Sequence, residues 1–208
     1  PPPLPRGGPR HSPAPAAGAT TPGAIAPACA FFPATTGAIM FWMKSGQTNT
    51  AAGGNEGAII WDRRTSSGNV IVLTAASNAN PGRLFSQPSG SSSFYSTARV
   101  DDDQWHHVAF VYNQAAGGTD TFYVDGVASG SVTHGAAWTW PATQQIELGR
   151  SHDTYWQKYH GLLDDVRFYN TAPTATQVAQ IANGADENVD AADVGLNLAA
   201  SLPGNAAA

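Results

Sequence analysis

The stretch WHHVAFVYN, Trp105–Asn113, carries the clearest strand pattern in this sequence. Apolar and aromatic side chains alternate along it, and successive side chains of a strand point to opposite faces. Val108, Phe110 and Tyr112 are therefore expected on one face, and the residues between them on the other. A period of two with large apolar residues on one side predicts a strand that lines a hydrophobic core.

Similar short apolar stretches occupy most of residues 37–169. Gly, Asn and Pro residues lie between them and favour turns. Many short strands with no helical pattern between them predict an all-β protein built from two packed sheets. The predicted strands fall within residues 38–44, 57–64, 69–77, 82–87, 105–113, 119–129, 144–150 and 161–170.

One short helix is predicted in TATQVAQIANG, residues 174–184. Thr174 can cap its first turn, and Gly184 can end it. Val178 and Ile181 are three positions apart, so they are expected to share one face of the helix.

Three segments resemble, in order, parts of one family. QWHHVAFVYNQAAGGTDTFYVDGVASGS, residues 104–131, resembles the central hairpin of the laminin G-like, concanavalin A-like jelly-roll domains. GLLDDVRFYNTAPTATQVAQI, residues 161–181, resembles their closing strand and short helix, and TTGAIMFWMKSG, residues 35–46, resembles an early strand. The resemblance covers about residues 35–183 and implies an antiparallel jelly-roll sandwich, whereas a shared fold does not fix a function.

The start of the chain departs from this family. Its members usually open with an acidic strand, but here AIAPACAFFPA, residues 24–34, stands in that place. We expect either a degenerate first strand or an open sheet edge, and open edges pair readily with other chains. The tail segment VGLNLA, residues 194–199, or the arm of another copy is a candidate strand for such an edge.

Composition divides the chain into three predicted parts. Residues 1–33 hold ten of the fifteen prolines and are expected to form an extended arm. Residues 34–184 are expected to form the jelly-roll domain, and residues 185–208 a low-complexity tail with a possible donor strand. The chain starts with PPPLPRGG and has no initiator Met, so we expect it to be cut from, or part of, a longer precursor.

The charge and cysteine content exclude several classes. The net charge is −5 with 12% charged residues, which argues against a nucleic-acid or anionic-membrane surface. No apolar run is long enough to span a bilayer. Cys29 is the only cysteine, so it forms no intrachain disulfide or zinc cluster. It is either a thiol that pairs between molecules or an inert one.

Charged and histidine residues offer candidate metal ligands. The Asp triplet 101–103 is expected to be a solvated turn, with a calcium site as the alternative. His106 and His107 are neighbours in a strand, so they face opposite ways and cannot both bind one metal ion. We therefore expect no cofactor, although structural calcium remains an alternative. Asp165 and Arg167 are expected to form an ion pair on one face of their strand.

Two aromatic segments are candidate recognition sites: WTWP, residues 138–141, and SHDTYWQKYHG, residues 151–161. Aromatic faces with a few polar groups suit a sugar-binding groove, but they are also enriched at protein interfaces. Packing within the domain is the third interpretation. The candidate residues are Trp138, Trp140, Tyr155, Trp156 and Tyr159.

The sequence shows no catalytic motif, so we expect a protein that is not an enzyme. SPAPA, PPPLP and ATTPG resemble the glycomodules of hydroxyproline-rich cell-surface glycoproteins of plants and algae, which implies O-linked sugars. Our first hypothesis is an extracellular, self-assembling structural subunit of a filament, appendage or coat, joined to other copies by its arm or tail. The alternative is a carbohydrate-binding or adhesion module of a larger cell-surface protein.

Overall fold

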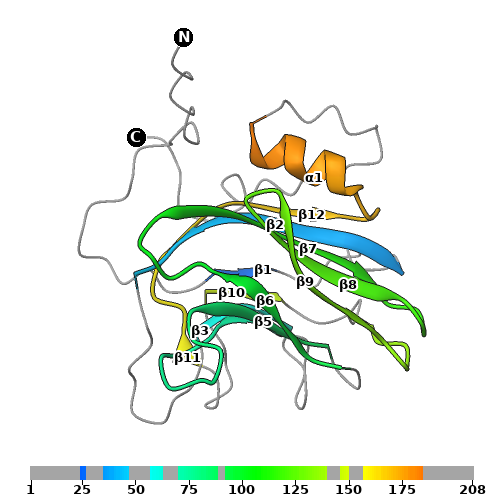
Figure 1. Ribbon diagram of the computed structural model, residues 1–208, viewed down its shortest axis with the longest axis horizontal. Coiled ribbons are helices and arrows are strands. Elements are labelled where there is room, and N and C mark those ends of the chain that lie inside the picture. The colour runs from blue at the N-terminus through cyan, green and yellow to red at the C-terminus, as the bar shows by residue number, and fades with distance from the viewer. Residues whose placement is uncertain are drawn as a thin grey trace.

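The computed structural model describes residues 24–26, 35–46, 57–62, 70–88, 92–139, 146–149 and 157–184. Two mainly antiparallel sheets pack face to face, and one helix lies on the outer side of one of them (Figure 1). The predicted jelly-roll sandwich with a single short helix is confirmed. Within the described part of the chain, no helix is long and apolar enough to cross a membrane.

The described residues form twelve strands and one helix. In chain order these are β1 (Ala24–Ala26), β2 (Thr36–Lys44), β3 (Gly57–Asp62), β4 (Val70–Leu73), β5 (Arg83–Gln87), β6 (Phe94–Arg99), β7 (Trp105–Asn113), β8 (Thr119–Val124), β9 (Val127–Thr133), β10 (Ile146–Leu148), β11 (Gln157–Lys158), β12 (Leu162–Tyr169) and α1 (Ala175–Ala182).

Each sheet has a simple strand order. The larger sheet runs β1-β10-β3-β4-β5-β6, and β11 also pairs with β3. The smaller sheet runs β12-β2-β7-β8-β9, so the stretch that predicted the fold, β7, is its central strand. β2 and β7 pair along their whole length, from Thr36 opposite Asn113 to Lys44 opposite Trp105.

The core lies between the two sheets and confirms the predicted alternation in β7. Val108, Phe110 and Tyr112 are each at most 1% exposed and belong to the main core cluster. Phe110 packs against Phe122 of β8, with ring centroids 5.3 Å apart. Each fully buried side chain of this size contributes about 1.5–3 kcal/mol through its removal from water.

The other face of the smaller sheet is covered by α1 (Figure 1). Val178 of the helix is fully buried against Ala38, Met40 and Ala109, and the two small alanine side chains let the helix approach the sheet closely. As predicted, Thr174 caps the helix, and its hydroxyl accepts a hydrogen bond from the Gln177 N–H.

The sequence analysis missed β6. Its sequence, FYSTAR, follows four Ser residues among 89–93 and reads as a polar loop. Ser96 is fully buried because its hydroxyl is satisfied: it accepts a hydrogen bond from the Leu84 N–H and donates one to the Ala98 carbonyl. A buried serine with both bonds made is compatible with a strand interior, but one of its partners, Leu84, is 12 positions away, so local sequence does not reveal the bond.

β6 and β9 close one side of the sandwich although they belong to different sheets. The Ser129 hydroxyl accepts a hydrogen bond from the Ala98 N–H at 3.0 Å and lies 3.2 Å from the Thr97 hydroxyl. Gly130 sits against the Tyr95 carbonyl, where a Cβ atom would overlap the oxygen. Two outermost strands therefore shield each other on this side.

β1 lies at the start of residues 24–34, where we expected either a degenerate first strand or an open sheet edge. It pairs antiparallel with β10, with Ile25 opposite Glu147. Ile25 is the only β-branched aliphatic residue among residues 1–33, which explains why the strand forms here. The rest of the arm, including Cys29, and the tail 185–208 lie outside the described residues. The division of the chain into arm, domain and tail stays a prediction.

Candidate functional site

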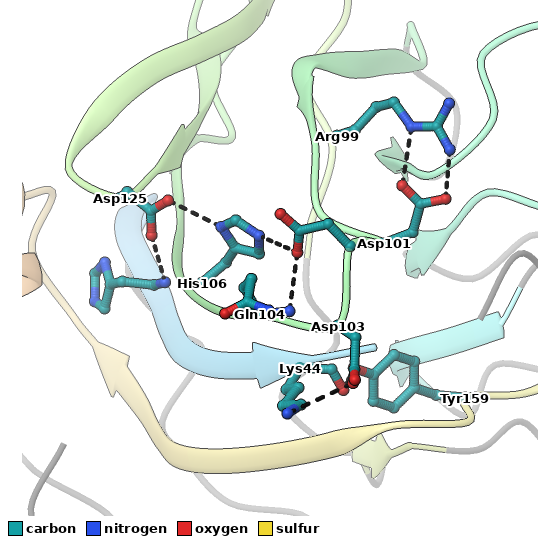
Figure 2. Close-up of polar contacts among 10 residues, drawn as sticks. Lys44, Arg99, Asp101, Asp103, Gln104, His106, Asp125 and Tyr159 are labelled. Carbon is teal, nitrogen blue, oxygen red and sulfur yellow. Dashed lines mark hydrogen bonds and ion pairs between the residues drawn. The ribbon is translucent and has the colours of Figure 1, made fainter. Parts of the chain in front are cut away.

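The Asp triplet 101–103 lies at the end of the sandwich where β7 begins (Figure 2). The Asp101 carboxylate accepts two hydrogen bonds from Arg99, at 2.9 and 2.6 Å, and its side chain is 3% exposed. Asp103 adopts a positive φ of 62° and lies 3.5 Å from the Lys44 ammonium. The triplet is therefore not only the solvated turn that we expected, because its carboxylates have separate protein partners.

Asp102, the middle residue, is one of two carboxylates that hold His106. The Asp102 Oδ1 atom lies 2.9 Å from His106 Nε2, and Asp125 Oδ2 lies 2.9 Å from His106 Nδ1 (Figure 2). Asp102 Oδ1 also accepts a hydrogen bond from the Gln104 N–H. We call Asp102, His106 and Asp125 the histidine clamp.

Asp125 reaches the clamp because of the turn between β8 and β9. Asp125 and Gly126 have φ values of 52° and 79°, as expected in a two-residue hairpin turn of the Asp-Gly type. The other oxygen of Asp125 accepts a hydrogen bond from the His107 N–H at 3.0 Å, and the Asp125 N–H donates to the His107 carbonyl at 2.8 Å. The clamp thus ties this hairpin to the start of β7 and to the loop before it.

The clamp favours a protonated imidazole. The hydrogen bond to Asp125 raises the pKa of His106 to about 9; burial opposes the shift, and the bond to Asp102 adds to it. Burial alone would raise the pKa values of Asp102 and Asp125, but the hydrogen bonds from His106 and from backbone N–H groups, together with the charge of His106, lower both pKa values below their ordinary range. With both ring nitrogens engaged as donors, His106 has no lone pair for a metal ion or for proton abstraction at neutral pH.

The clamp predicts how stability depends on pH. The folded-state pKa of His106, about 9, exceeds the ordinary value of 6.5, so its stabilisation is complete below 6.5 and is lost as the pH rises through about 9. His106→Ala is expected to lower the free energy of unfolding by about 1–2 kcal/mol at pH 6, a modest loss because the half-exposed carboxylates are screened by water. The loss should be smaller at pH 10, where the imidazole is neutral in the wild type as well. Urea unfolding across this range measures the difference.

His160→Ala is the matched control for this prediction, since that side chain is exposed and its backbone carbonyl accepts a bond from the Ser45 hydroxyl. It should leave the pH profile unchanged. A His106→Ala penalty that stays constant from pH 6 to pH 10 would contradict the clamp as a source of stability.

His107 confirms that the histidine pair is split across the strand. It is 2% exposed, and its ring meets Trp42 edge-on at 5.4 Å between centroids. Among the described residues, no group of three or more His, Cys, Asp or Glu side chains is arranged to hold a metal ion. The predicted ion pair of Asp165 and Arg167 is confirmed, with an N–O distance of 2.6 Å.

A second carboxylate–histidine pair is buried at the opposite end of the smaller sheet. Asp120 of β8 and His134, just after β9, have no exposed side-chain surface, and Asp120 Oδ2 lies 2.7 Å from His134 Nε2. The other oxygen of Asp120 accepts a hydrogen bond from the Asn113 N–H. Burial raises the pKa of Asp120 to about 6, although the Asn113 N–H and the nearby His134 ring lower it. No local sequence pattern pointed to this pair.

The structure places two of the five candidate aromatic residues inside the domain. Trp138 is 2% exposed and packs against Tyr112, with ring centroids 5.7 Å apart. Tyr159 is 8% exposed, and its hydroxyl donates a hydrogen bond to the Lys44 carbonyl (Figure 2). These two side chains therefore match the packing interpretation of the sequence analysis.

Trp138 and Tyr159 also lie at opposite ends of the smaller sheet. The Trp138 N–H donates to the Gln114 carbonyl beyond the last residue of β7, whereas Lys44, the partner of Tyr159, pairs with the first residue of β7. The structure does not bring these two residues together. Trp140, Tyr155 and Trp156 lie outside the described residues.

Comparison with known proteins shows the family. A model of the concanavalin A-like lectin/glucanases superfamily matches residues 18–179, so the chain belongs to this superfamily. Among curated protein sequences, none matches the chain.

Solved structures share the fold at low sequence identity. A heptameric SAP-like pentraxin from Limulus polyphemus is 18% identical, with a TM-score of 0.55 over 72% of this chain and 70% of that one. Domain 4 of AbnA, an extracellular arabinanase from Geobacillus stearothermophilus solved with arabinotriose, is 22% identical, with a TM-score of 0.53 over 71% and 66%. The CBM40 of the Ruminococcus gnavus IT-sialidase is 10% identical, with a TM-score of 0.54 over 71% and 82%.

Proposed function

We propose that this chain is a non-catalytic carbohydrate-binding module of an extracellular protein. Its superfamily contains lectins and glucanases, and the structure of the arabinanase domain with arabinotriose shows this type of sandwich with a bound oligosaccharide. A module role agrees with the chemistry of the histidine clamp, because His106 is held by two carboxylates and has no free lone pair for acid-base work.

The observation that carries the proposal is the backbone contact between Gly149 and Tyr159, which lie on either side of residues 150–156 in the sequence. The Tyr159 N–H donates to the Gly149 carbonyl at 3.2 Å, and the Gly149 N–H donates to Ile59. The segment contains Tyr155 and Trp156, together with two polar residues, His152 and Asp153. Aromatic rings with a few polar groups are typical of sugar-binding surfaces. We propose Tyr155 and Trp156 as glycan-contacting residues.

Trp156→Ala is expected to reduce glycan affinity at least tenfold, because a ring that stacks on a sugar supplies much of the binding energy of a shallow site. A glycan array first identifies a ligand, and isothermal titration calorimetry then compares the wild type and the variant. Trp140→Ala is the matched control, since its segment starts from Trp138 at the other end of the smaller sheet.

If only Trp140→Ala loses affinity, the site belongs to the WTWP segment rather than to residues 150–156. If neither variant loses affinity, the aromatic proposal is wrong. An absence of binding to every glycan on the array would contradict the module itself.

A second candidate is the self-assembling structural subunit of an extracellular filament or coat. The observation that favours it is β1, because a strand from the Pro-rich segment pairs at a sheet edge. Deletion of residues 1–33 is expected to abolish assemblies seen by negative-stain electron microscopy. Unchanged assemblies in the truncated protein would exclude the arm as the connector.

A further inference from the structure

We infer that β1 is an exchangeable strand, and that the edge of β10 accepts residues 24–26 of a second copy of this chain in the register that β1 occupies. Such an exchange would supply the contact between copies that the second candidate function, self-assembly, requires. It does not depend on glycan binding. The outermost strands of the two sheets differ in how they are protected from pairing with other chains.

The two main strand paths end at four outermost strands, and three of these, β6, β9 and β12, are protected. β6 and β9 cover each other through Ser129 and the close approach at Gly130. β12 carries a bulge between Asp164 and Arg167, and Asp165 has a positive φ of 51° within it. Bulges and charged side chains on an edge strand discourage pairing with other chains. β1 is the fourth, and it covers the edge of β10.

The edge of β10 requires a partner strand. Ile146 and Leu148 belong to the main core cluster, and Glu147 between them is fully buried. One edge of β10 pairs with β3, from Ile146 opposite Asp62 to Leu148 opposite Ile60. Without β1, the N–H and C=O groups on the other edge of this buried strand would lose their partners, which is costly away from water.

β1 is only weakly attached to the edge of β10, although this edge requires a partner strand. It has three residues and three paired positions, Ala24–Leu148, Ile25–Glu147 and Ala26–Ile146. Pro22 and Pro27 stand just outside it and have no N–H to extend the ladder. The chain must also close a loop to bring β1 back to its own sheet, and this closure has an entropic cost.

An identical strand from another copy satisfies the same edge with the same contacts. Residues 27–35 separate β1 from β2, and such a segment spans at most about 33 Å when extended. This reach allows β1 to leave its own sheet and pair with a neighbour. Exchange of an identical element costs little because every native contact is regained, and a head-to-tail arrangement gives an open polymer.

Sedimentation of the full chain over a hundredfold concentration range tests the exchange. The wild type is expected to at least double its mass at high concentration, whereas Ile25→Pro should remain monomeric, since proline removes the central N–H of β1. Ala17→Pro, which lies in the arm outside β1, is the matched control and should assemble like the wild type. A monomeric wild type, or an Ile25→Pro variant that assembles equally well, overturns the inference.

Cysteine pairing then shows which chain supplies the strand. Ala26 lies opposite Ile146, so Ala26→Cys and Ile146→Cys are made in separate chains that also carry Cys29→Ser, and the two proteins are mixed and oxidised. A disulfide that joins the two different chains is expected. If only a single chain with both substitutions becomes cross-linked, internally, the strand does not exchange. Glycan binding is measured separately, so either proposal can fail without the other.

Discussion

His134→Ala is expected to lower the free energy of unfolding by about 3–5 kcal/mol, because it leaves a fully buried carboxylate without its partner. Asp120 and His134 have no exposed side-chain surface and lie 2.7 Å apart, so water cannot replace the lost contact without entering the core. The Asn113 N–H still donates to Asp120, but one hydrogen bond does not compensate a buried charge. Urea denaturation monitored by tryptophan fluorescence measures the loss.

The pH dependence of this variant has a defined sign. Burial holds the folded-state pKa of Asp120 at about 6, above its ordinary value of 3.8, so the folded state favours the protonated carboxyl. Stability from this group is present below its unfolded pKa and is lost as the pH rises through about 6. Without His134 the penalty should therefore be larger at pH 8 than at pH 5.

A double-mutant cycle separates the pair from its surroundings. Asp120→Asn removes the charge at nearly the same size, and combined with His134→Ala it should recover part of the loss, since no carboxylate remains unpaired. A loss below about 1 kcal/mol in His134→Ala alone would mean that the pair contributes no more than a surface ion pair.

Gly130→Ala is expected to destabilise the domain by about 3 kcal/mol, because two independent penalties meet at one residue. Gly130 has a φ of 95°, a conformation that residues with a side chain rarely adopt. Its new methyl group would also overlap the Tyr95 carbonyl oxygen, so β6 and β9 must separate. That separation stretches the hydrogen bond from the Ala98 N–H to Ser129.

Gly135→Ala is the matched control, since an added Cβ there meets no atom within 4 Å. It should change the stability by less than about 0.5 kcal/mol in thermal or urea unfolding. If both substitutions have equal effects, the closure of the sandwich between β6 and β9 does not depend on the close approach at Gly130.

Local patterns predicted the parts of the fold that depend on neighbouring residues. The alternation of Val108, Phe110 and Tyr112 and the Thr174 cap follow from spacings of two to four residues. The histidine clamp could not be predicted in this way, because Asp125 is 19 positions from His106 and reaches it only through the hairpin turn. The burial of Trp138 and Tyr159 likewise depends on contacts with distant strands.

Trp138 and Tyr159 mark the two opposite ends of the smaller sheet. β2 and β7 each have nine residues, so their two ends lie about 27 Å apart. In the sequence, WTWP begins at Trp138 and SHDTYWQKYHG contains Tyr159, so each buried residue belongs to one aromatic segment. A monosaccharide is too small to reach from one end of the smaller sheet to the other, so its binding would test one end alone. If both segments bind sugars, the module is bivalent, and it can bridge two polysaccharide chains or follow a single long one.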